Sequence, residues 1–307
     1  MDTRELVIIG TGPAGLTAAI YARRAGLDAL LIEKGAVGGQ ILITDEVENW
    51  PGVARASGQE LVDSIYQHAM GFEPELLRAD VTGIVGQGPY WGVVTTEGEI
   101  MAKTVLIASG ASFRRLGCPG EARLTGMGVS YCAVCDGAFF EGEEVAVIGG
   151  GNTAVADVIY LARICRKVYL VHRRDKLRAT AIYHQRLAEL DNVELCWDSV
   201  ATEFLTENDE RPRVSGLRIR NQKTDGVRDL AVSAVFIAVG TTPNTEFLGG
   251  ALALDAGGYI IADGTGRTAT ADVFAAGDVR TKELRQVVTA VADGANCAES
   301  AADFLNA

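Results

Sequence analysis

The sequence is poor in basic residues and in histidine, and it lacks any long apolar run. Its 307 residues include 28 lysines and arginines against 40 acidic residues, which gives a formal net charge of −12. A protein face that binds nucleic acid needs clustered positive charge, so nucleic acid is excluded as the expected partner. No apolar stretch approaches the ~18 residues that a membrane helix needs, so we expect no membrane insertion.

The first residues also lack the features of an export signal. The segment MDTRELVIIG has no basic lead and no long apolar core, and its pattern predicts a strand almost at once. We therefore expect a cytoplasmic protein, in which cysteines normally stay reduced. The length of the chain is sufficient for two domains with separate cores.

Potential metal ligands are few and scattered. Of three histidines and six cysteines, only Cys132 and Cys135 stand close together, in SYCAVCDGAFF. A structural zinc site usually needs a second close pair of Cys or His, and the sequence has none, so no metal is expected. We expect the other cysteines to pack as small apolar side chains: Cys118, Cys165, Cys196 and Cys297.

Glycine is abundant, at 36 residues, and the first cluster of glycines has a defined pattern. The segment LVIIGTGPAGLTAAIYARRAGLDALLIEK predicts a strand, a glycine turn, a helix and a second strand. Gly10, Gly12 and Gly15 have the spacing that allows a tight turn, a close approach to a pyrophosphate and close packing of helix on strand. Glu33 ends the second strand, where a carboxylate binds ribose hydroxyls and repels a 2′-phosphate. This site is therefore expected to bind FAD or NAD rather than NADP.

The same pattern returns in EVAVIGGGNTAVADVIYLARICRKVYLVHRRDKLRA, with Gly149, Gly151 and Ala154 at the three glycine positions. At the position equivalent to Glu33, this second unit has His172. Three arginines follow it: Arg173, Arg174 and Arg178. Guanidinium groups bind phosphate oxygens in pairs, so this cluster indicates the 2′-phosphate of NADP.

Two nucleotide sites of opposite charge preference indicate a nicotinamide that donates hydride and a flavin that accepts it. The pair Cys132 and Cys135 lies between the two glycine loops, and a disulfide is a two-electron acceptor. A metal clamp lacks further ligands and a structural disulfide does not suit the cytoplasm, whereas a redox pair fits both observations. Asp136 could manage the proton as a general acid, and it could also cap a helix.

Seven segments, in order along nearly the whole chain, resemble the low-molecular-weight, prokaryote-type thioredoxin reductases. They are GTGPAG, GGQILITDEVENWPG, YCAVCDGAFF, GGGNTA, HRRDKLRA, VFAAGDV and RQVVTAVADG. The resemblance implies an NADPH-dependent thioredoxin-disulfide reductase that uses FAD and its own cysteine pair, with thioredoxin as the protein substrate and a homodimer as the assembly. The family usually has Thr where this chain has Val134, which we expect to alter the redox potential only slightly.

The resemblance also implies roles for individual residues. Cys132 and Cys135 become the redox-active disulfide, with Cys132 attacking the partner and Cys135 facing the flavin, and Asp136 becomes the acid–base residue. The residues expected to bind FAD are Gly10, Gly12, Pro13, Ala14, Gly15, Glu33, Lys34, Gly39, Gln40, Asn49, Gly277, Asp278, Arg285, Gln286 and Val287. Those expected to bind NADPH are Gly151, Asn152, Thr153, His172, Arg173, Arg174 and Arg178.

The expected fold is α/β, with two Rossmann-like dinucleotide-binding domains of three ββα layers, one inserted in the other. Short apolar strands at 104–111 and 234–241 are expected to close the two nucleotide units. The FAD-binding domain is predicted to be split between 1–114 and 245–307. The NADPH-binding domain, which carries the cysteine pair, is predicted at 115–244.

Three alternatives differ from this prediction in a visible feature. The flavoprotein of the alkyl hydroperoxide reductase system has an additional thiol domain before its first glycine loop, whereas here the first strand begins by residue 5. Ferredoxin-dependent or oxygen-dependent relatives lack the basic NADP cluster. A non-catalytic redox or nucleotide sensor would need neither the vicinal cysteines nor Asp136.

Overall fold

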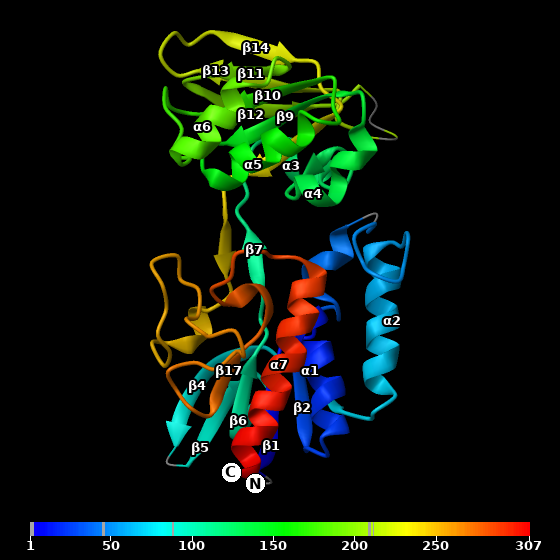
Figure 1. The fold of residues 1–307 in the computed structure, drawn as a ribbon, viewed down its shortest axis with the longest axis vertical. Helices are drawn as coiled ribbons and strands as arrows, with labels where there is room; N and C mark the ends of the chain where they lie inside the picture. The colour runs from blue at the N-terminus through cyan, green and yellow to red at the C-terminus, as the bar shows by residue number, and fades with distance from the viewer. Residues whose placement is uncertain (1–2, 45–46, 88, 208–209, 211) are drawn as a thin grey trace. The chain divides into compact units, whose positions relative to one another are not determined.

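The computed structural model describes residues 3–44, 47–87, 89–207, 210 and 212–307 (Figure 1). The chain divides into two compact units, the first formed by Met1–Ser112 and Thr242–Ala307 and the second by Phe113–Thr241. The second unit thus interrupts the first. The chain crosses the boundary at β7 (Ala111–Phe113) and β16 (Thr241–Pro243), which pair as a two-stranded sheet.

In the described part of the first unit, one sheet has the strand order β3-β2-β1-β6-β5-β4, with β17 also paired to β6. Its strands are β1 (Arg4–Ile9), β2 (Ala29–Glu33), β3 (Glu75–Arg78), β4 (Val81–Gln87), β5 (Tyr90–Thr95), β6 (Gly98–Ile107) and β17 (Val273–Ala275). Strands β3, β2, β1, β6 and β17 pair in parallel, whereas β4 and β5 pair antiparallel. The parallel strands end at one edge of the sheet, where the first glycine loop follows β1.

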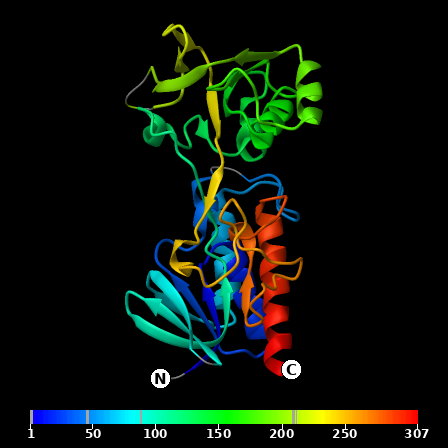
Figure 2. The ribbon, with the colours of Figure 1, turned by 90° about the vertical axis from the view of Figure 1, so that its left-hand side faces the viewer.

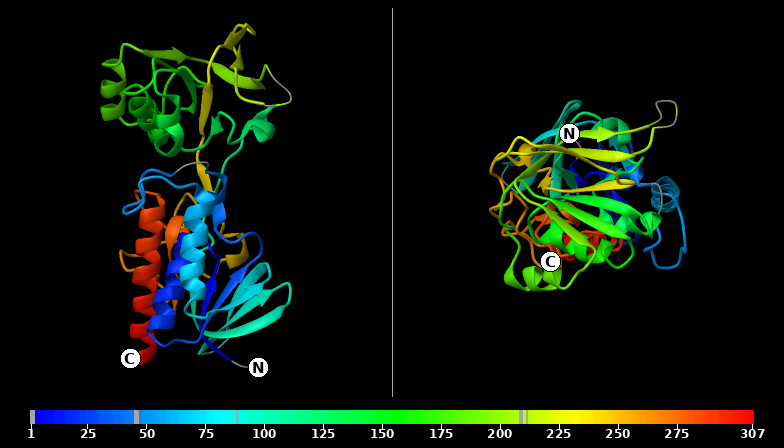
Figure 3. Two further views of the ribbon diagram at one scale, coloured as in Figure 1. Left: turned by 90° about the vertical axis from the view of Figure 1, so that its right-hand side faces the viewer. Right: turned by 90° about the horizontal axis from the view of Figure 1, so that it is seen from above.

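Helices pack on one face of this sheet. They are α1 (Pro13–Arg24), α2 (Gly58–Met70) and α7 (Val287–Asn306). The 3-10 turns described in the same unit are η1 (Gly39–Ile43), η3 (Glu246–Leu248) and η4 (Gly277–Val279). Helix α2 begins at a capping box in which Ser57 and Glu60 exchange hydrogen bonds. Helix α7 runs beside α1 (Figure 1), and α2 lies on the other side of α1 (Figure 3). The approach of α7 is close: a Cβ on Gly294 would lie 2.1 Å from the carbonyl oxygen of Ala14.

Alternating side chains of β1 supply two apolar cores. Leu6 and Ile8 are fully buried against α1 and α7. Val7 and Ile9 face the opposite way and pack with Trp91 of the β4–β5 hairpin. Figure 2 shows this hairpin, in cyan, on the side of the sheet away from the red helix α7. The unit is therefore a three-layer ββα arrangement.

The second unit repeats this plan. Its parallel sheet has the order β11-β10-β9-β15-β8, and a three-stranded antiparallel sheet has the order β12-β13-β14. The strands are β8 (Val129–Ser130), β9 (Glu144–Gly149), β10 (Lys167–Val171), β11 (Val193–Cys196), β12 (Ser199–Leu205), β13 (Gly216–Asn221), β14 (Val227–Leu230) and β15 (Ala234–Ala238). The helices are α3 (Glu121–Leu124), α4 (Ala133–Asp136), α5 (Asn152–Leu161) and α6 (Ala181–Ala188), and the 3-10 turn is η2 (Gly137–Phe140). Val145 and Val147 pack toward α5, whereas Ala146 and Ile148 pack toward the antiparallel sheet.

The structure confirms the predicted fold class, with two Rossmann-like units and one inserted in the other. The two glycine motifs follow β1 and β9, and each begins a helix, as the spacing predicted. Among the described residues, no helix combines the length and the apolar character that crossing a membrane requires.

Candidate active site

The two close cysteines form a disulfide in the second unit. The Sγ atoms of Cys132 and Cys135 are 2.12 Å apart and their Cα atoms are 5.3 Å apart. Cys132 caps the short helix α4, and its Sγ accepts a hydrogen bond of 3.2 Å from the backbone N–H of Cys135. Between them, Ala133 is buried in the core beside α5, whereas the side chain of Val134 is 49% exposed. One side of the turn is thus anchored and the other faces solvent.

Asp136 is tied to the main chain of this turn. Its backbone N–H donates to the carbonyl oxygen of Cys132 at 3.1 Å. Its Oδ2 accepts a hydrogen bond of 2.6 Å from the hydroxyl of Ser130, and the same hydroxyl oxygen accepts one of 3.0 Å from the N–H of Cys132. Ser130 was not among the predicted site residues, although the sequence shows a hydroxyl residue two positions before the first cysteine.

The three glycines of the first loop meet three different steric conditions. Gly10 has φ +102°, and a Cβ there would lie 2.5 Å from the carbonyl oxygen of Ala108. A Cβ on Gly15 would lie 1.9 Å from the carbonyl oxygen of Gly10. Around Gly12 the nearest atom, the carbonyl oxygen of Gly38, would be 3.8 Å away. Gly12 therefore leaves its backbone open to a ligand, as a pyrophosphate-binding turn requires.

Glu33 contacts this loop directly. Its Oε2 accepts hydrogen bonds from the N–H and the hydroxyl of Thr11 at 3.0 and 2.7 Å, and its Oε1 accepts one of 2.8 Å from the N–H of Gly35. An ionised carboxylate has roughly four lone-pair positions, so acceptor capacity remains for a ribose hydroxyl. Gly39 also borders the loop, since a Cβ there would lie 3.5 Å from Cα of Gly12.

The segment after β17 places a buried acid in the same unit. Burial raises the pKa of Asp278, against the opposing effect of Lys282 and Arg285, and Asp278 Oδ1 has no hydrogen-bond partner among the described residues. A buried unpaired carboxyl oxygen is the group that a hydroxyl-bearing ligand such as the ribitol chain of FAD would satisfy. The adjacent Gly277 reaches the first loop, because its Cβ would lie 3.0 Å from Cβ of Ala14. These residues therefore fit FAD.

A buried ionic cluster that the sequence did not predict holds this segment. The carboxylate of Asp293, on α7, accepts hydrogen bonds from the N–H of Gly277 at 3.0 Å, from Arg280 Nη1 at 3.0 Å and from Lys282 Nζ at 2.8 Å. Two of these donors, Gly277 and Arg280, stand on either side of Asp278 in the sequence. Asp293 comes 16 residues after Gly277, so no local pattern connects them.

The remaining residues predicted to bind FAD lie in the same unit and differ in the contacts that they make. Asn49 Nδ2 donates to Gln286 Oε1 at 3.1 Å, which brings two of the predicted residues together. Gln40 donates to the carbonyl oxygen of Ala111. Pro13 and Val287 are the first residues of α1 and α7, and Arg285 lies 4.2 Å above the ring of Tyr259. Lys34 is 71% exposed and pairs with Asp80 at 3.7 Å.

The second glycine loop is covered on one side by His172. A Cβ on Gly150 would lie 2.1 Å from Cε1 of His172, whose side chain is only 5% exposed. Burial lowers the pKa of His172, which favours the neutral form of the ring. Around Gly151, by contrast, no atom would lie within 4 Å of a Cβ. The ring of His172 thus packs against the loop at Gly150, whereas the backbone at Gly151 is open to a ligand.

The predicted arginines belong to a segment that is fixed over this loop. The N–H of Arg178 donates to the carbonyl oxygen of Gly150 at 2.7 Å, and the N–H of Thr180 donates to Oδ1 of Asn152 at 2.9 Å. The exposed members of the predicted NADPH set are Asn152, Thr153, Arg173, Arg174 and Arg178. The segment that carries the arginines is therefore bonded to the glycine loop at Arg178, and all three guanidinium groups are exposed, which fits a phosphate of NADPH.

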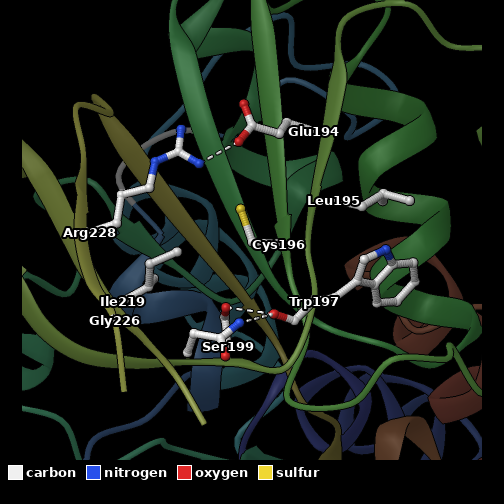
Figure 4. Close-up of a pocket in the computed structure, with 9 residues that line it drawn as sticks. Glu194, Leu195, Cys196, Trp197, Ser199, Ile219, Gly226 and Arg228 are labelled. Atoms are coloured by element: carbon white, nitrogen blue, oxygen red, sulfur yellow. Dashed lines mark hydrogen bonds and ion pairs between the residues drawn. The ribbon is translucent and has the colours of Figure 1, made fainter. Parts of the chain in front are cut away.

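A pocket of about 360 Å³ lies nearby in the second unit (Figure 4). Glu194, Cys196 and Trp197 line one side, and Ile219 and Arg228 line the other. Arg228 Nη1 and Glu194 Oε1 form an ion pair of 2.5 Å across it. Trp197 also meets His172 edge to face, with ring centroids 6.3 Å apart. Because its charged side chains pair with each other, we assign this pocket no ligand.

The other cysteines are separate from the disulfide. Cys165, Cys196 and Cys297 are buried, and Cys118 is half-buried. Within the described ranges, no group of three His, Cys, Asp or Glu side chains could hold a metal ion.

Comparisons with known proteins agree with this arrangement. The pyridine nucleotide-disulphide oxidoreductase family matches residues 4–294. The chain is 40% identical over 301 residues to a thioredoxin reductase of Bacillus subtilis (strain 168), covering 98% of this chain and 94% of that protein. It is 41% identical over 306 residues to a thioredoxin reductase of Peptoclostridium acidaminophilum, covering 99% and 97%.

A solved structure is also similar. The thioredoxin reductase from Streptococcus pyogenes MGAS5005 superposes with a TM-score of 0.93 at 44% identity, covering 99% of this chain and 98% of that one. These likenesses extend over both units and confirm the resemblance that the seven motifs indicated. The chain belongs to the pyridine nucleotide-disulphide oxidoreductase family, within its group of thioredoxin reductases.

Proposed function

We propose that the protein is an NADPH-dependent thioredoxin reductase. Electrons pass two at a time from NADPH, by way of FAD, to the Cys132–Cys135 disulfide and from there to the disulfide of thioredoxin. The observation that carries this proposal is the disulfide itself, which closes on a half-exposed turn in a unit that also holds a nucleotide-type glycine loop. The relatives of similar length that are named thioredoxin reductases support the same activity.

The FAD-binding domain is proposed to comprise 1–114 and 245–307, close to the bounds of the first unit. The glycine turn at Gly10–Gly15 and the start of α1 receive the pyrophosphate, because helix N-termini offer free N–H groups to phosphate. Glu33 binds the ribose and Asp278 binds the ribitol chain. Other proposed FAD contacts are Pro13, Ala14, Lys34, Gly39, Gln40, Asn49, Gly277, Arg285, Gln286 and Val287. FAD, when bound, supplies the two-electron carrier.

The NADPH-binding domain is proposed to comprise 115–244, close to the bounds of the second unit. Gly151, Asn152 and Thr153 lie at the start of α5 and receive the pyrophosphate of NADPH. Arg173, Arg174 and Arg178 bind the 2′-phosphate, and the buried His172 shapes the loop from beneath. The exposed arginines favour NADPH over the alternative of a ferredoxin-dependent enzyme, which has no use for a 2′-phosphate site.

The thiol chemistry proceeds by disulfide exchange. Two electrons and one proton break the Cys132–Cys135 bond and leave one thiolate and one thiol. Cys132 then attacks the disulfide of thioredoxin to form a mixed disulfide, and Cys135 displaces the reduced thioredoxin. Asp136 gives a proton to a departing thiolate and takes one back as the pair closes.

We further propose a homodimer in the cytoplasm. The family resemblance supports the dimer, which sedimentation of the purified protein would test directly. Besides the redox pair, the described residues include four cysteines that form no disulfide, which suits a compartment in which thiols stay reduced.

Replacing Cys135 by serine tests the proposal. The variant is expected to keep reduction of bound FAD by NADPH but to lose reduction of oxidised thioredoxin. Cys118→Ser, which removes a half-buried thiol outside the pair, is the matched control and should keep both. Thioredoxin reduction that survives in Cys135→Ser would contradict the proposed electron path, and turnover driven only by reduced ferredoxin would contradict the assignment of NADPH.

A further inference from the structure

Ser130 lies at the end of β8, two residues before the disulfide. Its position is fixed by the parallel pairing of β8 with β15, in which it stands opposite Phe236. The side chain is only 6% exposed, so its hydroxyl must find its hydrogen-bond partners within the protein. Those partners are the cysteine turn and the acid behind it.

The hydrogen of the Ser130 hydroxyl can point in either of two directions, because two acceptor atoms lie within hydrogen-bonding distance of it. The oxygen accepts from the N–H of Cys132 at 3.0 Å and donates to Asp136 Oδ2 at 2.6 Å. A second acceptor, the carbonyl oxygen of Cys132, lies 3.4 Å away. Since a serine hydroxyl has one hydrogen and two lone pairs, it can donate to an ionised Asp136. It can equally accept from a protonated Asp136 while its own hydrogen turns to the carbonyl.

We propose that Ser130 is a positioning residue for the redox chemistry of the pair, holding the carboxyl of Asp136 at the main chain of Cys132 in both protonation states. The inference rests on the proposed function, because it assumes that Asp136 exchanges a proton with the pair. When the S–S bond takes up two electrons it breaks, and the proton on Asp136 passes to a departing thiolate. The carboxylate that remains then accepts the hydroxyl hydrogen of Ser130.

The residue between Ser130 and Cys132 shows that this arrangement is specific to Ser130. Tyr131 donates its hydroxyl to a different carboxylate, Glu121, at 2.8 Å. Glu121 also accepts the backbone N–H groups of Leu116 and Gly117, so it anchors the incoming chain rather than the cysteine turn. Of these two neighbouring hydroxyls, the one on Ser130 is bonded to Asp136.

The test measures the rate at which dithiothreitol reduces the Cys132–Cys135 disulfide in the purified FAD-bound protein. This step needs a proton for the leaving thiolate but needs neither NADPH nor thioredoxin. Ser130→Ala is expected to slow it roughly tenfold, part of what a general acid contributes. Ser130→Thr, which keeps the hydroxyl, should recover most of the rate. Ser233→Ala is the matched control, because Ser233 donates to the exposed Glu143 at 2.8 Å and should leave the rate unchanged.

A double-mutant cycle with Asp136→Asn distinguishes positioning from general packing. If Ser130 acts through Asp136, adding Ser130→Ala to Asp136→Asn should cause less than a further twofold loss. Steady-state turnover of thioredoxin by Ser130→Ala should show a lower kcat with an unchanged KM for NADPH. Should Ser130→Ala not fold, Ser130→Gly takes its place with the same expectations.

Two results would overturn the inference. One is a dithiothreitol rate in Ser130→Ala equal to that of the wild type, and the other is a double variant whose loss equals the product of the single losses. A wild-type protein that reduces no thioredoxin would instead contradict the proposed function. Because the dithiothreitol rate is measured independently of thioredoxin, the two failures are distinguishable.

Discussion

Replacing Asp293 by asparagine would test how the segment around Asp278 is held in place. The Asp293 carboxylate binds Arg280 and Lys282, and the side chains of these three residues are only 11%, 8% and 9% exposed. It also accepts the N–H of Gly277. A neutral amide would leave two buried cations without their anion.

The expected loss is large for an isosteric change. Removing one partner of a buried ion pair costs about 3–5 kcal/mol, because the remaining charge is desolvated and uncompensated. The asparagine oxygen still accepts one hydrogen bond, so we expect the free energy of unfolding to fall by about 3 kcal/mol. Because Gly277 and Arg280 flank Asp278, we also expect FAD to bind roughly tenfold more weakly, a loss of about 1.4 kcal/mol in binding free energy.

Urea unfolding of the FAD-free protein and a fluorescence titration with FAD measure the two effects. Asp303→Asn is the matched control, since Asp303 lies on the same helix but is 79% exposed and 3.9 Å from Arg267. Such a surface pair contributes at most about 1 kcal/mol. The reasoning is refuted if Asp293→Asn loses no more stability than Asp303→Asn and keeps its affinity for FAD.

Three further changes have definite expected outcomes. Gly15→Ala places a Cβ 1.9 Å from the carbonyl oxygen of Gly10 and should abolish FAD binding in a titration, whereas Gly264→Ala, with no atom within 4 Å, should not. Arg178→Gln should raise the KM for NADPH about tenfold and leave the KM for NADH nearly unchanged, because the guanidinium is expected to face the 2′-phosphate. Burial raises the pKa of Asp157 to about 7, so the folded protein holds this proton more tightly than the unfolded chain and loses stability as pH rises from about 4 to 7. Asp157→Asn should therefore unfold at a higher Tm than the wild type at pH 8, with the difference shrinking toward pH 4; an equal difference at both pH values would contradict this.

Much of the fold could be predicted because it depends on short-range patterns. The spacing of Gly10, Gly12 and Gly15 is dictated by contacts within a single strand–turn–helix, and the structure shows the steric reason for two of them. The same pattern at Gly149 and Gly151 predicted the second unit. The disulfide is likewise a local feature, because only two residues stand between Cys132 and Cys135.

The features that were missed depend on residues far apart in the chain or on the direction of a side chain. Asp293 meets Gly277 and Lys282 only after α7 has packed against α1. His172 occupies the predicted register, but only the folded structure shows its ring beneath Gly150. Ser130 lies two residues before the pair. Only the folded structure shows that the cysteine turn brings Asp136 within hydrogen-bonding distance of its hydroxyl.

The most direct test of the proposed function is a count of free thiols during an anaerobic titration of the FAD-bound protein. Addition of NADPH should open the Cys132–Cys135 disulfide and expose two further thiols per chain to alkylation. Oxidised thioredoxin added next should remove those thiols and itself become reduced. A disulfide that stays closed while NADPH is consumed, or opened thiols that thioredoxin does not reoxidise, would contradict the account.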